Sequence, residues 1–115
     1  MNSREKGKRG ERELAQWLTD HGYPATRGAQ HRGGPDSPDV LCERLPVHWE
    51  VKRTEHLSLY SAVAQAAGEA GGQMPVVAHR RNGGPWLAVL RLEDLVGLLG
   101  RPGADERSSE AYGAL

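Results

Sequence analysis

Cysteine, long apolar runs and net charge are nearly absent from this sequence. The single cysteine, Cys42, excludes an internal disulfide framework and any zinc site built from several cysteines. No uncharged apolar run approaches the roughly 20 residues that a membrane-spanning helix needs. The charged N-terminus has no apolar segment typical of a secretory signal. We therefore expect a cytoplasmic protein in a reducing setting, with no membrane partner.

The charge balance is uneven along the chain although its sum is zero. Fifteen Lys and Arg residues match fifteen Asp and Glu residues, yet residues 1–10 carry a local charge of +3 and residues 93–115 a local charge of −3. A basic N-terminal end is a candidate surface for a polyanion, and a solvated arm is the alternative. The length of 115 residues predicts one domain, which we place at 1–99, with a polar, flexible tail at 100–115.

The hydrophobic pattern predicts eight elements in the order α-β-β-β-α-β-β-α. Helices are expected over 7–21, 58–70 and 92–99, and strands over 23–27, 39–43, 47–53, 74–79 and 85–90. Asn82-Gly83 indicates a hairpin turn, and the Gly- and Pro-containing stretch 28–38 indicates a loop. This order predicts an α/β fold in which helices cover one small sheet. Cys42 and the tryptophans Trp17, Trp49 and Trp86 are expected in its core.

Two neighbouring motifs contain the residue types of a candidate catalytic site. Pro38-Asp39 is followed eleven residues after Asp39 by Glu50-Val51-Lys52. Side chains alternate along a strand, so Glu50 and Lys52 share a face, and a short turn brings Asp39 alongside them. Two carboxylates suit Mg²⁺, and a lysine beside them can orient or deprotonate a water or stabilise charge on a phosphate. This combination indicates phosphodiester hydrolysis, and the alternative is an exposed ion pair on an amphipathic strand.

The first predicted helix adds a further acid. Glu11 lies on the same stripe as Leu14 and Leu18, where a charge needs a partner or a metal. Glu13 is rotated away from this stripe and is expected to be an ordinary surface residue. His48 shares a strand face with Glu50 and is a candidate neighbour of the site. The sequence has no H-E-x-x-H pattern and no phosphate-binding loop, so we expect neither zinc hydrolysis nor a nucleotide cofactor.

Four segments together resemble the PD-(D/E)XK nuclease superfamily, and within it the archaeal-type and phage Holliday-junction resolvases. They are KGKRGEREL (6–14), YPATR (23–27), SPDVL (37–41) and WEVKR (49–53). The resemblance implies a restriction-endonuclease-like fold, a mixed sheet flanked by helices, and a homodimer that works on four-way DNA junctions. It also implies Mg²⁺ or Mn²⁺ and hydrolysis that leaves a 5′-phosphate and a 3′-hydroxyl.

The resemblance assigns roles to individual residues. The catalytic residues it implies are Glu11, Asp39, Glu50 and Lys52. The metal ligands it implies are Asp39, Glu50 and the Val51 carbonyl, with Glu11 as a possible addition. Gln65, in the helix after the E-x-K strand, is expected to support the site. The resemblance also implies that Arg12 and Arg27 contact DNA or the active site. Local basic charge adds further expected DNA-binding residues, which are Lys6, Lys8, Arg9, Arg32 and Arg53.

Two other functions remain open on the sequence alone. One keeps the nuclease chemistry but acts on flaps, nicks or duplex DNA. The other is a catalytically silent DNA-binding subunit, against which the intact acids and lysine argue. A cleavage assay on several DNA substrates distinguishes a broader nuclease from a resolvase. A protein that binds DNA but cuts none of these substrates would be the silent subunit.

Overall fold

The computed structural model describes residues 3–28 and 38–100. Its helices are α1 (Ser3–Asp20), α2 (Leu59–Glu69) and α3 (Leu92–Leu99). Its strands are β1 (Thr26–Arg27), β2 (Val40–Leu41), β3 (His48–Arg53), β4 (Pro75–Arg80) and β5 (Leu87–Val89). This is the predicted order of elements, and the predicted α/β class is confirmed.

The five strands form one mixed sheet in the order β1-β2-β3-β4-β5. Neighbouring strands are antiparallel except β3 and β4, which run parallel with Glu50 opposite Val77. A parallel pair needs a crossover, and α2 supplies it between β3 and β4. The sheet with its flanking helices is consistent with the restriction-endonuclease-like fold expected from the sequence.

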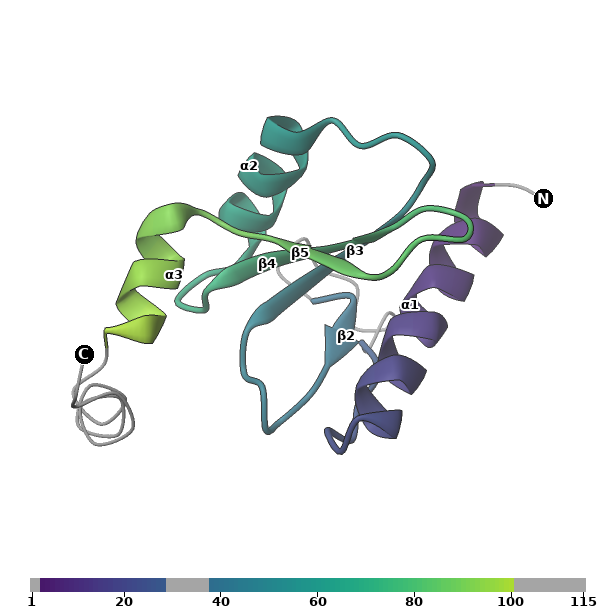
Figure 1. The fold of residues 1–115 in the computed structure, drawn as a ribbon, viewed down its shortest axis with the longest axis horizontal. Helices are drawn as coiled ribbons and strands as arrows, with labels where there is room; N and C mark the ends of the chain where they lie inside the picture. Colours follow the sequence, from purple (N-terminus) through teal and green to yellow (C-terminus); the bar gives the residue numbers. More distant parts are fainter. Residues whose placement is uncertain (1–2, 29–37, 101–115) are drawn as a thin grey trace, which may run out of the picture.

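Helices α1 and α2 lie on opposite faces of the sheet (Figure 1). On one face, Leu14 and Leu18 of α1 pack with Val40, Cys42 and Ala78. On the other, the small side chains Ala62 and Ala66 of α2 pack against Val77. Because side chains alternate along β3, Trp49 and Val51 face α1 while His48, Glu50 and Lys52 face α2. The predicted common face of Glu50 and Lys52 is therefore the α2 side.

Several details differ from the sequence-based expectation. The strands β1, β2 and β5 are two to three residues long, because the segments around them do not complete ladder pairs in the described sheet. Trp17 is 43% exposed and stacks on His21, with ring centroids 3.8 Å apart, so its place in the core was wrongly predicted. Trp17 lies at the edge of the apolar stripe of α1. There its ring stacks on His21 in the next turn of the chain and is not buried in the core. Trp49, Trp86 and Cys42 pack in or against the core as predicted.

Helix α3 has no buried residue, and Leu92, Val96 and Leu99 are exposed on it. Within 3–28 and 38–100, no helix is both long and apolar enough to cross a membrane. The predicted tail beyond Gly100 lies outside the described residues, as does most of the predicted 28–38 loop.

Candidate active site

Asp39 and Glu50 meet across the antiparallel pair β2–β3. The backbone register places Val40 opposite Trp49, and the Asp39 N–H donates to the Trp49 carbonyl at 2.9 Å. Asp39 directly precedes β2, and its Oδ2 accepts a hydrogen bond from the Val51 N–H at 2.8 Å. Glu50 is 4% exposed. The short turn predicted from the sequence thus brings the two carboxyl groups to one face of the sheet.

Burial makes both carboxyl groups hard to ionise. It raises the pKa of Glu50 from 4.5 to about 8, and the nearby charges of Asp39 and Glu69 add to the rise. Burial likewise raises the pKa of Asp39 from 3.8 to about 6, against the Val51 hydrogen bond, which lowers it. The charge of Glu11 also raises the pKa of Asp39, so α1 brings its acid within electrostatic reach of the pair. A cation bound between these groups would offset their repulsion.

Lys52 points towards α2, where it meets Gln65. The Lys52 Nζ donates to Gln65 Oε1 at 3.0 Å. The positive charge of Lys52 lowers the pKa of both Asp39 and Glu50, which places the ammonium close to the two acids. The structure therefore brings the predicted supporting residue directly against the predicted catalytic lysine.

Two residues without a predicted catalytic role complete the α2 side of the site. His48, Glu50 and Glu69 each offer a ligand atom, and these atoms lie within 4.8 Å of one another. His48 is 1% exposed, beside Glu50 as its strand position suggested. Glu69, the last residue of α2, was missed by sequence reasoning. Its only signal was its position four residues after Gln65, which repeats the helical period.

Glu11 finds its partner in β1. The Arg27 Nε donates to Glu11 Oε1 at 3.0 Å, and the Glu11 side chain is 14% exposed. The sequence indicated that an acid on the apolar stripe of the first helix needs a partner or a metal. In the structure this partner is Arg27, so two residues expected in the catalytic and DNA-binding sets form one pair.

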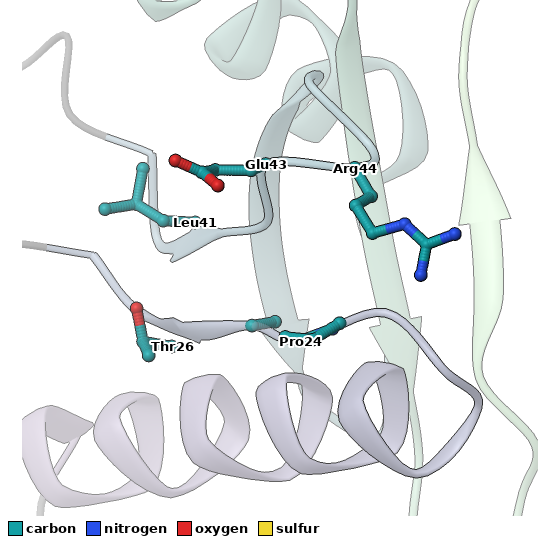
Figure 2. A pocket seen from close by; sticks show the side chains of 6 residues that line it. Pro24, Thr26, Leu41, Glu43 and Arg44 are labelled. Carbon is teal, nitrogen blue, oxygen red and sulfur yellow. The ribbon is translucent and has the colours of Figure 1, made fainter.

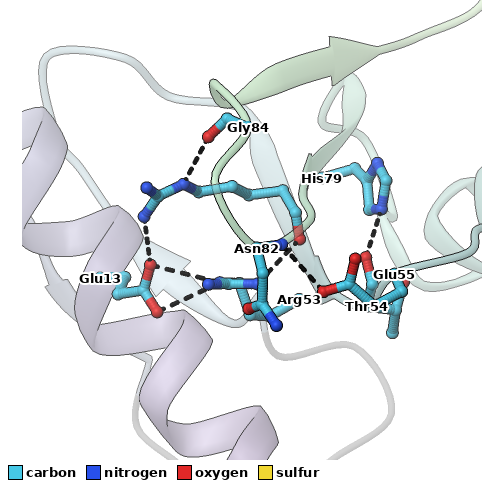
Figure 3. Close-up of polar contacts among 8 residues, drawn as sticks. Glu13, Arg53, Thr54, Glu55, His79, Asn82 and Gly84 are labelled. Atoms are coloured by element: carbon cyan, nitrogen blue, oxygen red, sulfur yellow. Dashed lines mark hydrogen bonds and ion pairs between the residues drawn. The ribbon is translucent and has the colours of Figure 1, made fainter.

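Glu13 is not the ordinary surface residue predicted from its helical position. Its carboxylate accepts Arg53 Nε at 3.2 Å and Arg80 Nη1 at 2.7 Å, which ties α1 to the ends of β3 and β4 (Figure 3). Arg53 also donates to the Arg80 carbonyl at 3.3 Å, and its side chain is 13% exposed. The partners of Glu13 lie 40 and 67 residues away in sequence, so helical periodicity alone did not reveal them.

The remaining basic residues expected to bind DNA lie along α1 or outside the described part. Arg9 and Arg12 are exposed and Lys8 is half-buried. Lys6 falls in the first turns of α1, and Arg32 falls outside the described residues. The exposed positions leave a basic strip on a helix that also carries Glu11.

A surface pocket of about 420 Å³ lies at the β1–β2 edge (Figure 2). Pro24, Thr26, Leu41, Glu43 and Arg44 line it together with Ala25. None of the acids or the lysine described above lines this pocket. The candidate active site is therefore the group of polar side chains between β2, β3 and α2, and not this hollow.

The residues present fit a hard divalent cation. Asp39 and Glu50 supply carboxylate oxygens, which Mg²⁺ and Mn²⁺ prefer. Burial raises the pKa of both acids and the positive charge of Lys52 offsets only part of that rise, so a cation beside them would favour their ionised forms. The peptide of Val51, whose carbonyl is the third expected ligand, is held against Asp39 by its N–H. The donor set alone does not distinguish Mg²⁺ from Mn²⁺.

Comparison with known families gives one match. Residues 2–96 match the family described as archaeal Holliday junction resolvase (Hjc). The match covers most of the chain, including every element from α1 to β5 and the Asp39, Glu50 and Lys52 positions. Comparisons with curated proteins and with solved structures found no match.

Proposed function

Because the chain belongs to the archaeal Holliday junction resolvase family, we propose that it resolves four-way DNA junctions by metal-dependent hydrolysis of phosphodiester bonds. The observation that carries this proposal is the convergence of Asp39, Glu50 and Lys52 on one face of the sheet. We also propose that it acts on branched DNA in the cytoplasm, as expected from the sequence.

Asp39 and Glu50 would hold the ion, with the Val51 carbonyl beside them and Glu11 as a possible further ligand. A bound divalent ion lowers the pKa of a coordinated water and offsets charge on a phosphate oxygen. The carboxylates must lose their protons to bind it, so binding releases protons to the solvent. The Val51 N–H fixes the Asp39 carboxylate in direction, which keeps one ligand in place before the ion arrives.

As an ammonium, Lys52 would orient the attacking water or stabilise charge that develops on the phosphate, and only as the neutral amine would it take a proton from that water. Its ammonium is held by Gln65, so the side chain enters the reaction already oriented. Gln65 would act through Lys52, which makes it a positioning residue.

The basic strip of α1 would contact the DNA backbone. Lys6, Lys8, Arg9 and Arg12 lie on this helix, and Arg27 is placed beside it by the bond to Glu11. Contacts to phosphates position a protein on DNA and make binding salt-dependent. We expect Arg53 to act chiefly by holding α1 against the sheet, since its guanidinium is bonded to Glu13. Arg32 stays a proposed DNA contact.

We also propose that the working unit is a homodimer. A four-way junction has two strands of like polarity that must both be cut. Two copies related by a two-fold axis present two identical active sites to such a substrate. This argument rests on the symmetry of the substrate.

The proposed metal ligands are tested with Asp39→Asn and Glu50→Gln. Each removes one negative charge while keeping the shape of the side chain. We expect junction cleavage in Mg²⁺ to fall at least about 100-fold, equivalent to roughly 2.7 kcal/mol of transition-state stabilisation. Junction binding measured in EDTA should stay within a few-fold of wild type, because neither acid attracts phosphate.

Glu43→Gln is the matched control, since it makes the same charge change on an exposed side chain outside the candidate active site. It should cut at the wild-type rate. Wild-type cleavage by either Asp39→Asn or Glu50→Gln would show that the metal is held elsewhere.

A further inference from the structure

A second cavity lies beside the E-x-K motif. It measures about 240 Å³, and the residues that line it are Glu55, His79, Arg81, Gly84, Pro85 and Leu87. In the sheet register, His79 of β4 lies opposite Lys52 of β3 on one side and opposite Leu87 of β5 on the other. Neighbouring strands are about 4.8 Å apart, so the cavity begins one strand away from the proposed catalytic lysine.

The strand residues of the cavity face the same side of the sheet as Lys52. Val77 and Val89 pack with the alanines of α2. His79 and Leu87 lie two residues from them along β4 and β5. Because side chains alternate along a strand, all four share the α2 face, which also carries Lys52. Helix α2 leaves Leu87 55% exposed, so a strand of DNA bound at the candidate active site can extend into the cavity.

Hydrogen bonds hold the walls of the cavity in place. The His79 Nε2–H donates to the Thr54 carbonyl at 2.9 Å, which restrains the imidazole ring (Figure 3). The Asn82 N–H donates to Glu55 Oε1 at 2.9 Å, which ties the turn between β4 and β5 to the segment that follows β3. The cavity is therefore formed before a ligand arrives, and a preformed site loses less conformational freedom on binding.

The cavity offers a ligand both charged and apolar groups. Glu55 and Arg81 are exposed, and within the described part of the chain Arg81 forms no ion pair with Glu55 or with any other acid. A guanidinium donates hydrogen bonds and a carboxylate accepts them. Pro85 and Leu87 add apolar surface, and His79 adds a flat ring. Glu55 would repel a phosphate in the cavity, whereas the edge of a nucleobase has donors and acceptors for both charged groups.

We propose that this cavity binds one nucleobase of the cut DNA strand, unstacked from its neighbours and next to the scissile phosphate. The proposal rests on the proposed nuclease function, which supplies DNA as the ligand. The flat face of the base would pack on the His79 ring and on Leu87. The cavity is smaller than the roughly 300–1,000 Å³ of a site for a drug-sized molecule, which suits a single base. A base beside a branch is also easier to unstack than one inside a continuous duplex.

The test is a set of four-way junctions in which one base at a time near the branch is removed, leaving an abasic residue. Binding is measured in EDTA at a fixed salt concentration, so the measurement does not depend on cleavage. Wild-type protein should lose affinity by about 5- to 150-fold at one position beside the branch, which is the usual range for one base stacked on a protein. Removal of the bases at the other positions should have little effect.

Leu87→Ala and Arg81→Gln should each weaken binding of the intact junction and reduce the effect of the sensitive abasic position to about 3-fold or less, because the base and the side chain belong to one contact. Leu41→Ala and Arg44→Gln are the matched controls, since they make the same changes in the pocket at the β1–β2 edge. They should keep the full abasic loss. Leu41 is 46% exposed and Leu87 55%, so both alanine variants should melt close to wild type.

Equal abasic losses in wild type, Leu87→Ala and Leu41→Ala would overturn the proposal, since the base would then be bound elsewhere. So would an equal loss by Arg81→Gln on every junction with a salt dependence shallower by about one phosphate contact, which would make Arg81 a contact to the DNA backbone. If wild-type protein binds junctions but cuts none in Mg²⁺ or Mn²⁺, the nuclease proposal fails by itself. The abasic comparison then still decides what the cavity binds.

Discussion

At the scale of single residues, the candidate site places acids where they are costly to the fold. Asp39 and Glu50 lie close together with raised pKa values, and Glu69 adds a third carboxyl group. Lys52 offsets part of this repulsion, since its charge lowers the pKa of both acids. The remaining repulsion is what a divalent cation would relieve. The acidity of Glu50 is therefore a measurable property of the metal-free protein.

The stability of the metal-free protein should fall as the pH rises from about 5 to about 8. Between the ordinary pKa of 4.5 and the folded value of about 8, folded Glu50 keeps a proton that the unfolded chain has lost. A rising pH therefore favours unfolding. The stability linked to the proton on Glu50 is fully present only below the ordinary pKa of 4.5, and it is lost as the pH rises to the folded pKa of about 8. Each unit between the two values corresponds to about 1.4 kcal/mol, so the decline should exceed about 1 kcal/mol. Urea unfolding in EDTA across this range measures it.

Glu50→Gln removes the titrating group and should flatten this decline. At pH 8 the variant should then be more stable than wild type, while at pH 5 the two should be similar. A decline of the same size in both proteins would show that Glu50 ionises normally in the fold.

At the scale of elements, α1 is fastened to the sheet by a close backbone approach and by one carboxylate. Gly10 faces β3, and a Cβ added there would lie 2.7 Å from the Arg53 Cβ and 3.3 Å from Val51 Cγ1. Glu13, one turn later, bonds both Arg53 and Arg80 (Figure 3). Because α1 also carries Glu11, the position of this helix on the sheet affects the active site.

Gly10→Ala should destabilise the protein by about 1–3 kcal/mol, because the extra methyl group forces α1 away from β3. Gly7→Ala on the same helix is the matched control. Nothing lies within 4 Å of a Cβ at Gly7, so alanine there should stabilise the helix by up to about 1 kcal/mol. Urea unfolding of both variants measures the difference. Equal effects at the two positions would mean that α1 does not pack this closely.

Glu13→Ala should cost about 1–3 kcal/mol of unfolding free energy, because it leaves two partly buried guanidinium groups without their carboxylate. Junction cleavage well below the melting temperature should change less than 3-fold, an estimate for a residue that acts through the fold. Thermal unfolding and a cleavage time course measure the two effects. A large loss of cleavage at full stability would instead place Glu13 in the active site.

Local patterns were enough to predict the order of elements and the meeting of Asp39, Glu50 and Lys52. Alternation along one strand and a short turn are local rules, and they hold here. The bonds of Glu13 depend on Arg53 and Arg80, which only the folded sheet brings together. Glu69 was missed for a related reason: its contact depends on how α2 lies over β3. Trp17 shows that a local pattern can also predict too much burial, since an apolar residue at the edge of a helical stripe need not be buried.

At the scale of the whole molecule, the family and the small size of the chain together predict that two copies assemble. A family member of 12.5 kDa presents one candidate active site, while a junction must be cut on two strands. Light scattering of the purified protein should therefore give about 25 kDa, twice the mass of the chain. A 12.5 kDa monomer that still makes paired cuts in a junction would contradict the symmetry argument.

The most direct test of the central claim is cleavage of a labelled, immobile four-way junction in Mg²⁺. The same labelled strand should be tried in linear duplex, in a flap and as a single strand. We predict paired, symmetric cuts in the junction alone, and none in EDTA. Equal cutting of the linear duplex would contradict junction specificity, and tight binding of the junction with no cutting in either Mg²⁺ or Mn²⁺ would contradict the proposed nuclease activity itself.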